Sequence, residues 1–247
     1  MTEQDKLKIS QNVDRIRAEM VEACKRAGRD PKEVKLCAAS KVRDVETVSY
    51  AATLPIDIFG ENRVQEFVQK RDAGAYRDTP YHFIGHLQTN KVKQVVGCAL
   101  IHSVDSSKLL QKVNSEAEKI GIVQNILIEV NIGGEESKSG CNPADLWGLL
   151  EEAGSCKNLH VKGLMTIPPV ADSPEEARPY FAKMRALFDE AAGKNLPNVE
   201  MEILSMGMSG DFATAIEEGA TVVRVGTAIF GARPPWHPAA EAAKPKE

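Results

Sequence analysis

The strongest constraint on the fold of this chain is a regular alternation between short apolar runs and longer amphipathic segments. Eight runs have the character of buried strands, at residues 34–40, 56–60, 80–84, 99–103, 123–131, 159–165, 199–204 and 221–225. Helical patterns lie between them, for example at residues 106–120, 143–153, 174–192 and 209–218. Eight strand–helix units predict an α/β fold, the (β/α)8 TIM barrel. A doubly wound open sheet also alternates, but it rarely needs eight similar units.

A further helix is expected before the first strand. Apolar residues recur at helical spacing between Leu7 and Ala27, and Gly28 follows as a terminator, so this helix should pack on the outside of the barrel. The chain has 247 residues, of which 43% are hydrophobic, and this is enough for one barrel domain over residues 1–232. Residues 233–247 are rich in Pro and Ala without apolar periodicity, which predicts a flexible tail.

Composition argues against several classes of partner. The net charge of -4, without a clustered basic face, argues against nucleic acid. The five cysteines form no C-x-x-C pair, so neither a zinc site nor a disulfide framework is indicated, and a reducing cytoplasm fits best. No run approaches the roughly 20 apolar residues of a membrane span, so no membrane partner is expected. The sequence shows no obvious exposed apolar stripe, so we expect a monomer and leave a dimer open.

The residues of greatest chemical interest follow the predicted strands, where a barrel carries its active site. Lys41 follows the first strand, Ser205 ends the seventh, and Gly226 and Thr227 follow the eighth. Hydroxyl groups and unhindered backbone N–H groups suit an anion, and phosphate is the natural candidate. Lys41 is either a solvated flank or a partly desolvated amine, with a lowered pKa, that can form a Schiff base. An amine beside a phosphate pocket suggests pyridoxal phosphate.

Arg224 interrupts the eighth apolar run, and a guanidinium in such a strand needs a partner. The partner is either a carboxylate, in a structural ion pair, or the ring nitrogen of the cofactor. An arginine cannot accept a proton, so it would leave that nitrogen unprotonated and weaken the ring as an electron sink.

Two other features near the expected barrel mouth are less specific. His82 and His86 would lie together on a helix, but here they fall on a strand and diverge, so no metal site is expected. His86 either lines the pocket or is an ordinary loop residue. Residues 133–140 form a polar loop over the barrel mouth and are a candidate lid.

Motifs along nearly the whole chain resemble the pyridoxal phosphate homeostasis proteins, also called the proline synthase co-transcribed homologue family. The motifs are Ala38 to Lys41, Phe59 to Asn62, Val64 to Glu66, His82 to Gln88 with Asn90 and Lys91, His102 to Asp105, Asn131 to Gly140, Gly163 to Pro168, Ser205 to Ser209 and Val223 to Gly231. Tyr81 stands where the family commonly has Trp.

The resemblance implies a barrel similar to the N-terminal domain of alanine racemase, with the aldehyde of pyridoxal phosphate held as a Schiff base on Lys41. It assigns the phosphate to Ser205, Gly226 and Thr227, the ring nitrogen to Arg224, and the pocket walls to Asn62, His86, Met165 and Ser209.

The resemblance also implies a non-enzymatic function. Two-domain racemases of this fold bring a second acid/base residue from an additional domain and a dimer partner, and no such domain is recognised here. The expected role is therefore intracellular homeostasis of pyridoxal phosphate by buffering or delivery, which would influence amino-acid and keto-acid balance. Apo forms of enzymes that use the cofactor are candidate recipients. The alternatives are a racemase-like enzyme, with water or His86 assisting Lys41, and a regulatory module that recruits a partner protein.

Overall fold

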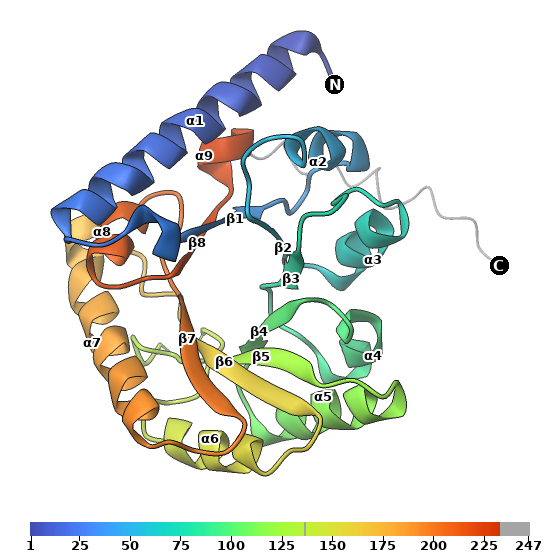
Figure 1. Cartoon of the computed structure of the whole chain (residues 1–247), viewed down its shortest axis with the longest axis vertical. Helices are drawn as coiled ribbons and strands as arrows, with labels where there is room; N and C mark the ends of the chain where they lie inside the picture. Colours follow the sequence, from blue (N-terminus) through green and yellow to red (C-terminus); the bar gives the residue numbers. More distant parts are fainter. Residues whose placement is uncertain (136, 233–247) are drawn as a thin grey trace.

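The computed structural model describes residues 1–135 and 137–232 (Figure 1). Eight parallel strands pair in chain order, and β8 returns to β1 to close a barrel. The strands are β1 Lys35–Ala39, β2 Ile58–Glu61, β3 Tyr81–Phe83, β4 Leu100–Val104, β5 Gln124–Glu129, β6 Leu159–Met165, β7 Val199–Ser205 and β8 Val222–Val225. The predicted TIM barrel is confirmed, and the open sheet is excluded because the sheet has no free edge.

Helices form a ring around the strands, as Figure 1 shows. They are α1 Glu3–Arg26, α2 Val45–Ala51, α3 Val64–Asp72, α4 Val92–Val95, α5 Ser107–Lys119, α6 Leu146–Gly154, α7 Pro174–Gly193, α8 Phe212–Glu217 and α9 Thr227–Phe230, with short 3-10 turns η1 Pro31–Glu33 and η2 Thr89–Lys91. The longer helices that follow the strands are amphipathic and bury an apolar stripe; in α5 the buried face includes Leu109, Leu110 and Val113.

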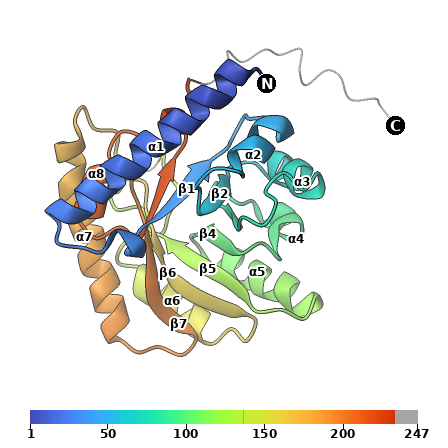
Figure 2. The same ribbon diagram turned by 45° about the horizontal axis from the view of Figure 1, so that its top comes forward.

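The additional N-terminal helix is confirmed as α1, which crosses the outside of the barrel (Figure 2). It begins well before Leu7 because Thr2 and Asp5 form a reciprocal capping box. Its buried side chains pack mainly against α8 and α9. The Thr-x-x-Asp signal was present in the sequence, and the apolar pattern alone missed this first turn.

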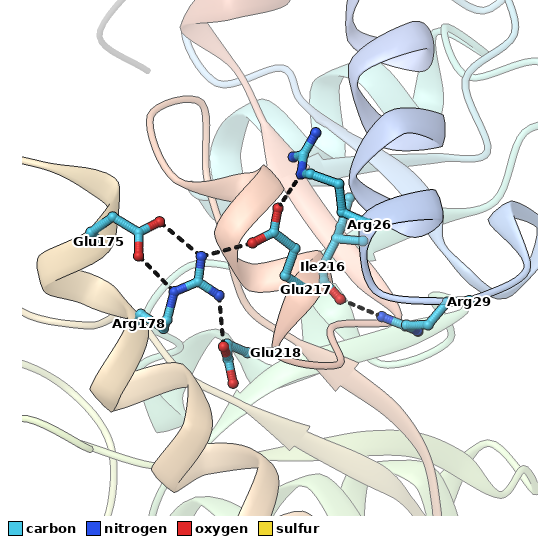
Figure 3. Close-up of polar contacts among 7 residues, drawn as sticks. All are labelled: Arg26, Arg29, Glu175, Arg178, Ile216, Glu217 and Glu218. Carbon is cyan, nitrogen blue, oxygen red and sulfur yellow. Dashed lines mark hydrogen bonds and ion pairs between the residues drawn. The ribbon is translucent and has the colours of Figure 1, made fainter.

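A cluster of charged side chains fixes the end of α1 against α7 and α8 (Figure 3). Arg178 of α7 forms ion pairs with Glu217 and Glu218, both at distances of 2.7 Å. Arg26 of α1 pairs with the same Glu217, and Arg29 donates to a backbone carbonyl of α8. Exposed ion pairs contribute little individually, so the main effect of this network is to set the orientation of the three helices.

The barrel interior changes from apolar to polar along the strands. One apolar group contains Cys37, Ile58 and Val222, and another contains Leu100 and Leu127. Side chains that point into the barrel recur at every second residue of a strand. Two residues beyond Leu100, Ile203 and Val222, the next inward positions are His102, Ser205 and Arg224. This polar layer lies directly below the barrel mouth.

Some expectations need adjustment, and one lies outside the described residues. The helix expected at 209–218 begins only at Phe212, because residues before it form a loop in which the backbone N–H of Met208 donates to Asp211 Oδ1. The helix expected at 143–153 begins at Leu146. All five cysteines are buried free thiols. No helix within the described residues is long and apolar enough to cross a bilayer. The predicted tail, 233–247, lies outside them.

Gly163 provides a test of the barrel closure. Its φ of +144° is unfavourable for other residues, and a Cβ there would lie 1.9 Å from the carbonyl oxygen of Ile203 on β7. Gly163→Ala should therefore reduce the free energy of unfolding by about 2 kcal/mol or more. The control is Gly148→Ala on the exposed face of α6, where the added Cβ would have no neighbouring atom within 4 Å. This substitution should increase the free energy of unfolding by roughly 0.5–1 kcal/mol. Equal effects of the two substitutions in urea unfolding would contradict this account.

Candidate functional site

The candidate site lies at the carboxyl ends of the strands, where β1 and β8 are neighbours. Register pairing places Ala38 beside Val225, and Lys41 and Gly226 follow these strands. A Cβ on Gly226 would lie 3.1 Å from the carbonyl oxygen of Ala39. The turn that carries Lys41 and the loop after β8 are therefore adjacent at the mouth.

The turn that carries Lys41 is held in an unusual conformation. Lys41 is half-buried, and the next residue, Val42, has a φ of 59°, which β-branched residues rarely adopt. The backbone N–H of Val42 donates to Glu66 Oε2 of α3 at 2.6 Å. Arg43 donates to the carbonyl oxygen of Gly231, after α9, at 2.7 Å. Contacts from both sides therefore fix this turn.

A buried ion pair supports the same turn from below. Lys70 Nζ lies 2.7 Å from Glu61 Oε1, and the two side chains are 2% and 0% exposed. Lys70 also donates to the carbonyl oxygen of Ser40, whose hydroxyl donates to Glu61. Burial raises the pKa of Glu61, and the nearby Lys70 opposes that shift. The sequence analysis missed Lys70, although it continues the apolar face of α3 that contains Val64 and Phe67.

A group of hydrogen bonds joins the loops that follow β7 and β8. Ser209 Oγ accepts hydrogen bonds from the backbone N–H groups of Gly226 at 3.1 Å and Ala228 at 3.3 Å. Thr227 lies between these two residues and is exposed. The structure therefore brings Ser209, Gly226 and Thr227 together, with a hydroxyl and successive N–H groups of the kind that bind phosphate oxygens.

Ser205 lies apart from this arrangement, inside the barrel. Its hydroxyl oxygen accepts a hydrogen bond of 2.6 Å from Arg224 and lies 3.0 Å from His102 Nδ1. Arg224 also donates to the carbonyl oxygen of Thr166 at 2.8 Å, and burial lowers its pKa. No ion pair links Arg224 to a carboxylate of the described residues, so both of its partners there are neutral oxygens.

The remaining predicted residues lie at different levels of the site. Asn62 is half-buried at the mouth, and its Oδ1 is buried without a hydrogen-bond partner among the described residues. Gly85 permits this placement, since a Cβ there would lie 2.2 Å from the carbonyl oxygen of Asn62. Met165 is fully buried inside the barrel, below the mouth. His86 is exposed, with Nδ1 3.2 Å from the hydroxyl of Ser139 in the candidate lid.

Glu129 is a carboxyl group of the barrel interior that the sequence analysis did not single out. It ends β5 and is only 4% exposed. Burial, assisted by the charge of Asp105, raises its pKa to about 7, and Arg224 opposes the shift. The sequence did indicate this residue, because Glu129 is a carboxyl group at the end of an apolar strand.

The two histidines of the third strand diverge: His82 is buried, and His86 is exposed beyond the strand. Across residues 1–135 and 137–232, no group of three or more His, Cys, Asp or Glu side chains is arranged to hold a metal ion.

Known proteins match this chain in sequence and in fold. A protein from Aquifex aeolicus named pyridoxal phosphate homeostasis protein is 47% identical over 224 residues, which span 90% of this chain and 97% of that relative. A Pseudomonas aeruginosa protein of the same name is 40% identical over 91% of this chain and 96% of its own length. This chain belongs to the pyridoxal phosphate homeostasis protein family. The family model for the alanine racemase N-terminal domain also matches, over residues 11–234.

Solved structures share the fold of this chain. PipY of Synechococcus elongatus, solved with PLP bound, is 32% identical and has a TM-score of 0.79, covering 90% of this chain and 100% of PipY. An unknown protein from Bifidobacterium adolescentis is 36% identical with a TM-score of 0.89, covering 93% of this chain and 97% of that protein. Alanine racemase from Clostridium difficile, at 16% identity and a TM-score of 0.67, covers 88% of this chain and 60% of its own and shows a common fold.

The raised pKa of Glu129 predicts a pH dependence of stability. Its pKa rises from 4.5 to about 7, so the folded protein binds this proton more tightly than the unfolded chain does. The protonated carboxyl therefore contributes its full stabilisation below pH 4.5, and this contribution is lost as the pH rises through about 7. The free energy of unfolding should fall by about 3 kcal/mol in total over this range. Glu129→Gln should therefore be more stable than the unsubstituted protein at about pH 8, by up to that amount, and equally stable at about pH 4.

Urea unfolding of the cofactor-free protein across this pH range provides the measurement. Glu118→Gln, an exposed carboxylate on α5, is the control and should leave the pH profile unchanged. Parallel profiles for Glu129→Gln and the unsubstituted protein would show that Glu129 does not titrate in this way.

Proposed function

We propose that this protein binds pyridoxal 5'-phosphate, as a Schiff base on Lys41, and serves its homeostasis in the cell. The observation that carries the proposal is the adjacency of Lys41 to the Ser209–Gly226–Ala228 arrangement, which offers an amine beside a phosphate site. The names of the relatives and the PLP-bound structure of PipY support it.

The side chains present fit this cofactor. Ser209 and the backbone N–H groups of Gly226, Thr227 and Ala228 would hold the phosphate, and the N–H groups of Gly226 and Ala228, which now donate to Ser209 Oγ, would turn to it. The Ser205 hydroxyl would not reach it, because it is fully buried inside the barrel. The buried Oδ1 of Asn62 lacks a partner among the described residues, and a hydroxyl of the ligand would satisfy it.

The remaining predicted residues would contact the cofactor from three sides. Arg224 would face its ring nitrogen from within the barrel, Met165 would form part of the floor, and His86 would stand at the rim.

The chemistry expected at this site is reversible capture. Lys41 would supply the amine for reversible condensation with the pyridoxal aldehyde, with release of water. Arg224 can donate a hydrogen bond but cannot accept a proton, so it leaves a facing ring nitrogen unprotonated. Such a ring is a weak electron sink, and this favours holding and releasing the cofactor over carbanion chemistry.

We favour a carrier over an enzyme. The relatives are named for homeostasis, and His86, the candidate second base, is exposed and engaged with Ser139. The cytoplasmic location, the monomeric state, the single domain over residues 1–232 and delivery to apo enzymes stay predictions.

Replacement of Lys41 tests the covalent attachment. With added pyridoxal phosphate the protein should gain a visible absorption band, and borohydride should fix the cofactor to the peptide that contains Lys41. Lys41→Arg keeps the positive charge but should lose both signals, because a guanidinium does not form the imine. The control Lys93→Arg, on an exposed helix face, should retain them. A protein that binds no cofactor, and stays colourless after the excess is removed, would refute the proposed function.

Isotope exchange separates the carrier from the racemase-like alternative. A carrier should show no exchange of the α-hydrogen of alanine or other amino acids in deuterated water above the rate of free cofactor. It should also restore activity to an apo form of an enzyme that requires pyridoxal phosphate. Exchange that depends on Lys41 and is lost in Lys41→Arg would instead establish an enzyme.

A further inference from the structure

A chain of buried hydrogen bonds crosses the barrel interior from β3 to β8, directly below the mouth. His82 Nδ1 lies 2.9 Å from His102 Nε2, and His102 Nδ1 lies 3.0 Å from Ser205 Oγ. Ser205 Oγ in turn accepts from Arg224 at 2.6 Å. The four side chains are at most 6% exposed, so water does not compete with these contacts. The chain therefore connects two histidines to the arginine below the proposed ring site.

The chemistry of the groups gives this chain one direction. Arg224 can only donate, so Ser205 Oγ must accept from it. The Ser205 hydroxyl proton then points to His102 Nδ1, which must be the unprotonated nitrogen. His102 consequently carries its proton on Nε2 and donates it to His82 Nδ1. The reverse direction would leave the buried Ser205 hydroxyl proton without an acceptor, which is costly.

Both histidines keep this protonation state at neutral pH. Burial lowers the pKa of His82 to about 3. Burial also lowers the pKa of His102 well below 6.5, and the charge of Arg224 adds to this effect. His82, His102 and Ser205 are therefore all neutral, and the direction of their hydrogen bonds does not change across the physiological pH range.

The chain anchors the guanidinium of Arg224 at two points. One Nη group donates to Ser205 on β7, and the other donates to the carbonyl oxygen of Thr166, directly after β6. Of the five N–H groups of an arginine, two are used in this way within the described residues. Anchors on two strands fix the plane of the guanidinium and leave further donors for a ligand at the mouth.

We propose that His102 and Ser205, supported by His82, are positioning residues that orient Arg224 toward the ring nitrogen of the bound pyridine cofactor. This inference rests on the proposed function, but its first test does not require the cofactor.

The first test is the tautomeric state of the histidines in the whole protein. Nuclear magnetic resonance of isotopically labelled histidine should show His82 and His102 protonated at Nε2, with no titration between about pH 5 and 8. Loss of the two signals in His82→Gln and His102→Asn assigns them. A proton on Nδ1 of His102, or titration within that range, would overturn the direction of the chain and with it the proposal.

The second test compares pyridoxal phosphate with an analogue in which the ring nitrogen is replaced by a C–H group. The unsubstituted protein should prefer the natural cofactor. His102→Leu removes the acceptor of the Ser205 hydroxyl, and that preference should fall about tenfold, as expected for one misplaced hydrogen bond. His102→Asn can present its amide oxygen at the place of Nδ1 and should restore most of the preference.

Controls separate positioning from general damage to the site. Ser209→Ala should weaken both ligands equally, because it acts on the phosphate. His160→Leu, near the amino end of β6 and paired with Glu200, should change neither. An unchanged preference in His102→Leu would overturn the inference while leaving the proposed function intact. Absence of binding to the unsubstituted protein would refute the proposed function, and the tautomer measurement would still decide the direction of the chain.

Discussion

The pairing of β8 with β1 is the interaction on which the rest of the molecule depends. It sets Cys37 beside Arg224 and Ala38 beside Val225, and it closes a sheet that would otherwise have two open edges. The same pairing places Lys41 next to the loop that contains Gly226. No local segment contains the site, because its two halves come from opposite ends of the chain and meet only where β8 pairs with β1. The site therefore depends on closure of the barrel.

The barrel contains two buried cations, Lys70 and Arg224, whose partners differ in charge. Lys70 is paired with the carboxylate of Glu61, which neutralises its charge where the barrel meets α3. Arg224 is held by the neutral oxygens of Ser205 and Thr166, so within the described residues its charge is not cancelled by an ion pair. Burying a charge in this way is unfavourable for folding, and it leaves a positive potential below the mouth that suits an electron-rich ligand.

Most of the fold followed from the sequence, because eight apolar runs and the helices between them leave few alternatives to a barrel. The helix starts were less predictable, since the N-terminus of α8 depends on the loop formed by residues 206–211. Sequence also identified residues that meet at the mouth, including Lys41, Ser209 and Gly226. The sequence could not show that Ser205 points into the barrel while Ser209 lies at the mouth.

The partners of the buried polar groups were beyond reach of the sequence. Ser205 falls at an inward position of β7, and its neighbours His102 and Arg224 come from distant parts of the chain. Alternation predicts which side of a strand a residue faces, but not which side chains meet across a barrel. The same limit applies to Lys70 and Glu61, whose pairing depends on the angle at which α3 packs against β2.

The unusual backbone of Val42 has a thermodynamic consequence for any ligand at the mouth. Glu66 and Arg43 hold this turn in place through contacts within the chain itself, and the buried Lys70 supports it from below. The conformational entropy of ordering the turn is therefore lost during folding and not during association. A ligand that binds at the mouth meets an arranged loop, so little of its interaction free energy is diverted into ordering the protein.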